Sequence, residues 1–255
     1  MKSNINWLLD TPFAHMGIHS APDTPENSLS AFSKAIDNGI AIELDIQVIA
    51  DNSVVVFHDD HLHRLTGLSK HTDEVTLAEI KQLSLYETAE AIPTLQEVLA
   101  LVAGAVPLLI EIKNPKNRKG IEPSILHALQ GYQGDYAIQS FNPFTLAWFK
   151  RNAPEIPRGQ LSGSLKHEKM NLIKKFVLKT MLLNWHSKPD FIVYDLRGLS
   201  SRRAERLRSK RPLLLWTVTS EEEQRIATTL GHNYIIDIDD LENYQTKSSG
   251  TSNLA

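Results

Sequence analysis

The chain of 255 residues contains no cysteine. This absence excludes disulfide bonds, thiolate metal sites and a cysteine nucleophile, and it is typical of proteins from a reducing compartment. No apolar run reaches the roughly 18 residues that a transmembrane helix needs, and the first residues lack the apolar segment of a secretory signal peptide. We therefore expect a cytoplasmic protein without a stable membrane anchor.

An excess of one charge is also lacking. The 27 basic and 30 acidic residues are interspersed and give a formal net charge of -3, so no basic stripe is present for a nucleic-acid backbone. A glycine-rich phosphate loop of the nucleotide-binding types is absent, which disfavours nucleotide-dependent transfer. The expected partner is a small molecule rather than a nucleic acid, and the sequence leaves the oligomeric state open.

Short β-branched runs alternate with longer amphipathic runs, a pattern that predicts parallel strands joined by helices. The second and third runs, "AIELDIQV" and "VVVFH", are too close for a parallel crossover and must form a hairpin. The other eight strands predict a (β/α)₈ TIM barrel with a small insertion after the second barrel strand. The nine expected strands begin at Thr11, Ala41, Val54, Val106, Tyr136, Pro157, Phe191, Leu213 and Tyr234.

Helix signals fill most of the gaps between these strands. Thr24 reads as the N-cap of the first helix, with Pro25 in its first position and Gly39 at its end. We expect one domain over residues 1–242, with an insertion at about 50–92, and a flexible tail over 243–255. Helices are predicted over 25–38, 95–103, 122–129, 143–152, 168–183, 202–209 and 220–229, and another begins at Thr76 within the insertion.

Two of the predicted strands carry charged residues at alternate positions. In "IELDIQ", Glu43 and Asp45 point to the same face, about 7 Å apart, and in "LIEIK" Glu111 and Lys113 do the same. An exposed edge strand or a simple Glu111–Lys113 ion pair would explain either motif alone. Two strands with the same pattern favour an inward-facing site at the barrel mouth, where barrel enzymes keep their catalytic residues.

Three carboxylates without cysteine suit a hard divalent cation, Mg²⁺ or Ca²⁺. His15 ends the first strand and His58 ends the returning strand of the hairpin, so the topology predicts that both reach the same rim. Two imidazoles can remove one proton and supply another near neutral pH. Together with a lysine for an anion, this set suits displacement at phosphorus, and hydrolysis is its simplest form.

Six stretches occur in the order found in one known family: "AHMGIHSAPDTPENSLSAF", "IELDIQVIADNSVVVFHDDHLHRLTG", "IPTLQEVL", "LLIEIK", "QSFNP" and "LLLWTV". From about Phe13 to Val218 the chain resembles the glycerophosphodiester phosphodiesterases. The resemblance implies a (β/α)₈ barrel that cleaves glycerophosphodiesters to glycerol 3-phosphate and an alcohol with a divalent cation. By position, the resemblance implies that the metal ligands are Glu43, Asp45 and Glu111. It also implies that the general acid and base are His15 and His58, and that Lys113 contacts the phosphate.

Three further residues have two interpretations each. Trp216 near the end of a late strand could offer its ring to the glycerol backbone of the substrate, or it could fill the core. Glu26 and Asn27 are better explained by helix capping or by support of the site than by catalysis.

The sequence departs from the family pattern at two positions. Met16 stands where the family has an arginine, and the loss of such a forked cation typically costs about 3 kcal/mol, or 10² to 10³ in rate. We therefore expect a weakened enzyme, unless Lys113 or Arg64 compensates. The late stretch "YIIDIDDLE" has Asp237 where the family's usual "ITD" ending has a small polar residue.

Two alternative functions stay open beside the phosphodiesterase. One is a lysophospholipase D, for which the basic and apolar stretch from Lys174 to Trp185 would touch a bilayer, although a helix packed on the barrel explains that stretch better. The other is a catalytically silent protein that binds phosphodiesters, which only Met16 supports.

Overall fold

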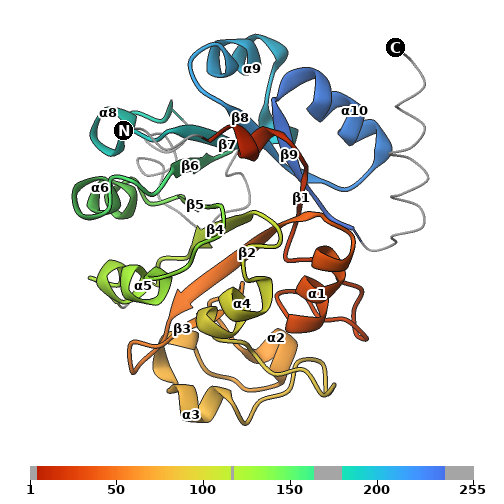
Figure 1. Cartoon of the computed structure of the whole chain (residues 1–255), viewed down its shortest axis with the longest axis vertical. Coiled ribbons are helices and arrows are strands. Elements are labelled where there is room, and N and C mark those ends of the chain that lie inside the picture. The colour runs from red at the N-terminus through yellow and green to blue at the C-terminus, as the bar shows by residue number, and fades with distance from the viewer. Residues whose placement is uncertain (1–4, 116–117, 164–179, 239–255) are drawn as a thin grey trace.

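The computed structural model describes residues 5–115, 118–163 and 180–238. Eight parallel strands form a closed barrel, and the helices surround it (Figure 1). The ring closes where β1 pairs with both β2 and β9, which confirms the predicted (β/α)₈ barrel. Its strands are β1 (Phe13–Ala14), β2 (Ala41–Val48), β4 (Leu108–Ile112), β5 (Tyr136–Ser140), β6 (Arg158–Ser162), β7 (Phe191–Asp195), β8 (Leu213–Val218) and β9 (Asn233–Ile236).

The ninth strand, β3 (Val54–Val56), lies outside the ring and pairs with the strand β2 in the antiparallel direction. This is the predicted hairpin. The chain between β3 and the next barrel helix forms a small unit with its own apolar cluster, which includes Phe57, Leu62 and Ile80. It contains α2 (His63–Thr66), η2 (Thr72–Glu74) and α3 (Leu77–Ile80), so the insertion after the second barrel strand is present.

The remaining described helices lie on the outside of the barrel or close its ends (Figure 1). They are η1 (Asn6–Leu9), α1 (Leu29–Asp37), α4 (Leu95–Val102), α5 (Glu122–Leu129), α6 (Pro143–Asn152), α8 (Asn184–Ser187), η3 (Leu196–Gly198), α9 (Ser201–Arg208) and α10 (Glu221–Leu230). Most of the helix predicted over 168–183 and the whole tail over 243–255 lie outside the described residues. That residues 1–242 form one domain stays a prediction.

The predicted start of the first helix is wrong by one turn. The N-cap is Ser28, whose side chain accepts a hydrogen bond from the backbone N–H of Ala31 at 3.2 Å. Thr24 instead forms a two-way backbone bridge with Ser20. Asn27 has a positive φ of 56°, which a helix does not allow, so the helix cannot begin before it.

Apolar side chains on the strands divide into two layers because they alternate between faces. One layer packs between the strands and the helices and includes Ile42, Leu44 and Ile110. The other fills the barrel interior, with Phe13 and Leu109 in it and Leu8 of η1 packed against it. Further along the same inward faces the residues become polar, which places a site at the carboxyl ends of the strands.

Within the described ranges, no helix has the length and apolar character needed to cross a membrane.

Candidate active site

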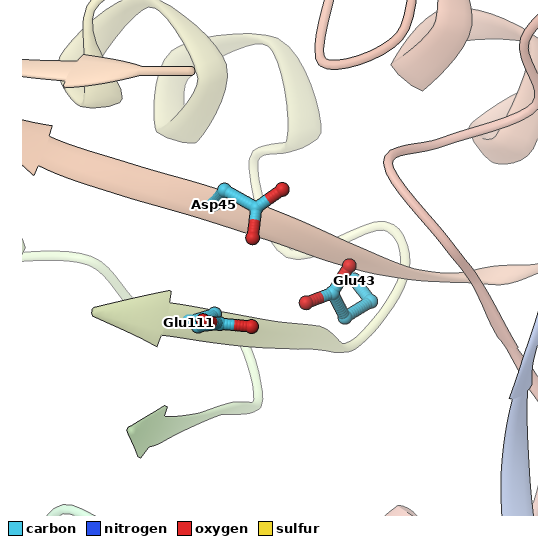
Figure 2. A group of neighbouring side chains, drawn as sticks. All are labelled: Glu43, Asp45 and Glu111. Atoms are coloured by element: carbon cyan, nitrogen blue, oxygen red, sulfur yellow. The ribbon is translucent and has the colours of Figure 1, made fainter. Parts of the chain in front are cut away.

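Three carboxylates from two neighbouring strands meet inside the barrel mouth (Figure 2). Glu43 and Asp45 lie on β2, and Glu111 lies on β4 directly opposite Asp45 in the parallel register. One oxygen from each residue lies within 4.8 Å of the others, and the three residues are only 2%, 1% and 8% exposed. The structure therefore brings together the side chains that the alternating pattern predicted on one face.

Lys113 follows β4 and supplies a positive charge to this group. Its Nζ lies 2.9 Å from Asp45 Oδ1 and 2.8 Å from Glu111 Oε1. Burial lowers the pKa of this ammonium, but the two carboxylates outweigh burial and raise it overall. The predicted Glu111–Lys113 ion pair is thus present, as one part of a larger cluster.

One ammonium does not balance three carboxylates. Burial, together with the charge of Asp45, raises the pKa of Glu43 to about 8. Burial also disfavours the charged form of Asp45, but Lys113 and the two histidines lower its pKa to about 2. Buried like charges of this kind are stabilised either by protonation of one carboxyl group or by a further cation among them. Three oxygen donors of this hardness fit a divalent ion such as Mg²⁺ or Ca²⁺.

Amide groups fix two of the three carboxylates in place. Asn27 Nδ2 donates to Asp45 Oδ2 at 2.9 Å, and Asn27 Oδ1 accepts from the Asp45 backbone N–H at 3.2 Å. Gln139 on β5 donates from Nε2 to Glu43 Oε1 at 3.0 Å. Of the two interpretations of Asn27, support of the site agrees with these contacts, because Ser28 caps the helix.

His15 follows β1, and its side chain contacts the residue that follows the neighbouring strand β9. Its Nδ1 lies 2.5 Å from Oδ1 of Asp237, the residue after β9. Burial lowers the pKa of His15, but the hydrogen bond to Asp237 and the charges of Glu43, Asp237 and Asp45 together raise it to about 9. The carboxylate on Nδ1 leaves Nε2 as the nitrogen available for chemistry.

His58 approaches the site from the hairpin strand. The N–H of Phe57 donates to the Asp45 carbonyl at 2.9 Å, which ties this end of the hairpin to β2. His58 Nδ1 lies 2.7 Å from Asp59 Oδ1, and its side chain is 40% exposed. The two histidines therefore have the same arrangement, with Nδ1 on a carboxylate.

Arg64 of α2 holds the carboxylate that contacts His58. It donates from Nε and Nη2 to Asp59 at 2.6 and 3.0 Å, and from Nη1 and Nη2 to Glu26 at 2.8 and 2.6 Å. A further contact joins Nη1 to the Tyr86 hydroxyl at 3.4 Å. Since these contacts engage the whole guanidinium, Arg64 is not placed to compensate for the arginine absent at position 16.

Met16 and Gly17 lie in the turn that follows β1, and the conformation of this turn restricts which residues fit there. Met16 is buried and its backbone N–H lies 3.4 Å from Glu43 Oε2. Gly17 has a φ of +81°, and a Cβ there would lie 2.9 Å from the backbone of Ala31. Glycine is therefore required by both conformation and space.

Trp216 lies near the end of β8 and is half-buried. Its ring packs edge-on against Phe141 with centroids 5.8 Å apart, and its Nε1 donates to the Ser162 carbonyl at 3.3 Å. One part of the ring thus belongs to the barrel interior and another is accessible, so both interpretations of this residue stay open.

Two sets of contacts around the histidines were not predicted from the sequence. Asp59 adjoins His58 in "HDDHLHR", and this adjacency was a usable signal for the first set. Asp237 lies 222 residues from His15, and only the closure of β1 onto β9 brings it there.

Comparison with known proteins bears on this geometry. The sequence model of the glycerophosphoryl diester phosphodiesterase family matches residues 19–238. This chain belongs to that family. The resemblance that the motifs indicated, and the phosphodiesterase class that goes with it, are therefore confirmed.

Relatives within the glycerophosphoryl diester phosphodiesterase family come from several bacteria. A glycerophosphodiester phosphodiesterase of Caldanaerobacter subterraneus is 35% identical over 58% of this chain and 65% of its own length. One from Bacillus altitudinis is 33% identical over 61% of this chain and 68% of its own. A phosphodiesterase of Oleispira antarctica, solved with the product sn-glycerol-3-phosphate, has the same fold with a TM-score of 0.78. It is 23% identical, and the match covers 94% of this chain and 98% of that one.

Proposed function

We propose that this member of the family hydrolyses glycerophosphodiesters to glycerol 3-phosphate and an alcohol, and that one Mg²⁺ or Ca²⁺ ion is required. The observation that carries the proposal is the buried cluster of Glu43, Asp45 and Glu111, which Lys113 alone does not neutralise. The names of the bacterial relatives support the substrate class, and the product in the Oleispira antarctica structure supports a small phosphate ester as ligand.

Each residue of the cluster then has a role. Glu43, Asp45 and Glu111 hold the cation, which when bound supplies positive charge to the phosphate oxygens. Lys113 adds a second positive charge beside the phosphate. Trp216 presents the accessible part of its ring to the glycerol backbone of the substrate.

His15 and His58 carry out the proton transfers. One imidazole removes the proton from the oxygen that attacks phosphorus, and the other protonates the oxygen of the leaving alcohol. Their carboxylate partners orient both rings in the same way, through Nδ1. We further propose that the substrate reaches the protein in the cytoplasm and that no nucleic acid takes part.

An assay of purified protein against a panel of glycerophosphodiesters tests the proposal. We expect glycerol 3-phosphate release with Mg²⁺ or Ca²⁺, and loss of release in excess chelator. Glu111→Gln should reduce activity by at least 10²-fold, whereas Glu222→Gln on the exposed face of α10 serves as the matched control. Full activity in chelator would contradict the metal requirement.

Met16→Arg separates the enzyme from the silent binding protein. The substitution restores the arginine that the resemblance implies at this position, whose backbone N–H lies beside Glu43, so we expect the rate of a slow enzyme to rise by roughly 10- to 10²-fold. Binding of glycerophosphocholine without turnover, in the wild type and in this variant alike, would instead favour the binding protein.

Exposed apolar side chains favour the lysophospholipase D as a second candidate. Phe144 on α6, and Leu182 and Trp185 at α8, are 62%, 58% and 71% exposed. Ring contacts to His186 at 6.1 and 5.5 Å connect Phe144 and Trp185 into one patch. Half of the stretch from Lys174 to Trp185 lies outside the described residues.

Co-sedimentation with anionic vesicles that contain lysophospholipid tests this candidate. If it is correct, Trp185→Ser should weaken both vesicle binding and lysophospholipid cleavage several-fold. Ile226→Ser, a similar change on α10, should leave both unchanged. Protein that remains in solution with such vesicles would exclude this function.

A further inference from the structure

The contact between His15 and Asp237 joins the residues that follow the neighbouring strands β1 and β9. His15 Nδ1 and Asp237 Oδ1 are 2.5 Å apart, and the two side chains are 22% and 35% exposed. An imidazole N–H that donates to a carboxylate forms a charge-assisted hydrogen bond, which is shorter than a bond between neutral groups.

The backbone fixes both partners independently of the side chains. Phe13 and Ala14 pair with Ile235 and Ile236 in the parallel sheet, so the residues that follow the two strands are neighbours. The N–H of His15 donates to the Ile236 carbonyl at 2.9 Å, and the N–H of Asp237 donates to the Val218 carbonyl at 2.9 Å. Asp237 therefore meets His15 without a change in either strand.

We infer that Asp237 is a positioning residue for His15, and that it holds the imidazole with its Nδ1–H on the carboxylate and its Nε2 available to the reaction. The inference rests on the proposed function of His15. A carboxylate on one ring nitrogen fixes which nitrogen carries the proton and restricts rotation of the ring.

The other histidine provides a comparison within the same molecule. His58 has Asp59 on Nδ1 at 2.7 Å, and Arg64 and Glu26 hold that carboxylate in turn. With Asp237 in place, both imidazoles are oriented through the same nitrogen. Without it, His15 would lack the carboxylate that His58 has.

The test uses full-length protein labelled with ¹⁵N-histidine and three variants. Asp237→Asn keeps the shape of the side chain but removes its charge, so a purely structural role would survive it. Asp237→Glu keeps the carboxylate. Asp135→Asn, an exposed aspartate before β5, is the matched control.

Proton NMR gives a readout that does not depend on turnover. We expect a strongly deshielded, slowly exchanging Nδ1–H in the wild type, assigned to His15 by its absence in His15→Gln. It should be lost in Asp237→Asn and retained in Asp135→Asn, with and without divalent ion. A resonance that persists unchanged in Asp237→Asn would overturn the inference.

Kinetics give the second readout. Asp237→Asn should lower kcat by about 10- to 10²-fold with KM changed less than threefold, and Asp237→Glu should recover part of the loss. Full kcat in Asp237→Asn while His15→Gln is inactive would also overturn the inference. Full activity in His15→Gln would contradict the proposed role of His15, and the NMR result would still decide whether Asp237 orients the ring.

Discussion

Asn27 contacts the side chain and the backbone of Asp45, so it fixes one of the three carboxylates more firmly than strand geometry alone. Asn27→Ala removes both contacts, and loss of such a partner typically costs 10- to 100-fold in metal affinity. We expect a decrease of this size in Mg²⁺, Ca²⁺ or Mn²⁺ affinity, measured by calorimetry. Asn38→Ala, at the exposed end of α1, is the control. Unchanged affinity in Asn27→Ala would show that Asp45 needs no such support.

The pH dependence of His15 is a second prediction at this scale. Burial opposes protonation of its ring, but Asp237, Glu43 and Asp45 raise its pKa to about 9 in the metal-free protein. Because this value lies above the usual 6.5, the stability from the protonated ring is complete below pH 6.5 and is lost as the pH rises through about 9.

A histidine titration of the metal-free protein by NMR checks this value. One ring should titrate near pH 9, while His232, which burial and Arg208 affect, should titrate below 6.5. A divalent ion among the carboxylates should lower the pKa of His15, since it opposes their charge. Titration of every histidine near 6.5 would contradict the electrostatics described for the site.

The sequence predicted the residues of the cluster better than their partners. Glu43, Asp45 and Glu111 follow from the two-residue period of a strand, which needs no knowledge of the loops. Asp237 reaches His15 through barrel closure, and Arg64 in the insertion reaches Glu26, so these contacts depend on tertiary structure. Local patterns do not encode them.

At the scale of elements, the start of α1 shows how a local signal fails. Thr24 and Pro25 have the residue types of a helix start, but Asn27 is needed by Asp45 and takes a left-handed conformation to reach it. The helix therefore begins after Ser28. In contrast, α5 and α6 have the bounds predicted from their patterns.

Gly17 lies before α1 and Gly39 lies after it, and substitutions of these two glycines give a matched test of packing. Gly17 and Gly39 both have positive φ, but a Cβ on Gly17 would meet Ala31 at 2.9 Å and one on Gly39 would meet nothing within 4 Å. Gly39→Ala should cost about 1 kcal/mol in unfolding free energy from backbone strain alone. Gly17→Ala should cost about 1–3 kcal/mol more, because the strand and helix must separate.

Urea denaturation of both variants measures these costs. The Gly17 variant should also lose activity, since the turn that it distorts carries His15. Equal destabilisation of the two variants would show that the turn has room for a side chain.

At the scale of the whole molecule, the alternation of strand and helix predicted the barrel because each βα unit carries its own periodicity. The short link between β2 and β3 predicted the hairpin for the same local reason. The domain bounds depend on residues beyond the described part, and they stay predictions.

Metal binding should stabilise the entire barrel, because β2 and β4 share the ion. A ligand at about 100 times its Kd adds about 2.7 kcal/mol, which for a domain of this size raises Tm by roughly 5–10 °C. Thermal unfolding with Mg²⁺, Ca²⁺ or Mn²⁺ should show this increase in the wild type and in Glu222→Gln. An equal increase in Glu111→Gln would place the ion elsewhere.

The position of the ion is the most direct test of the account. A crystal of the wild-type protein with Mn²⁺ should show one anomalous peak within roughly 2.0–2.6 Å of an oxygen from each of Glu43, Asp45 and Glu111. A protein that turns over glycerophosphodiesters in the crystallisation buffer, yet has no peak between these three carboxylates, would contradict the central claim.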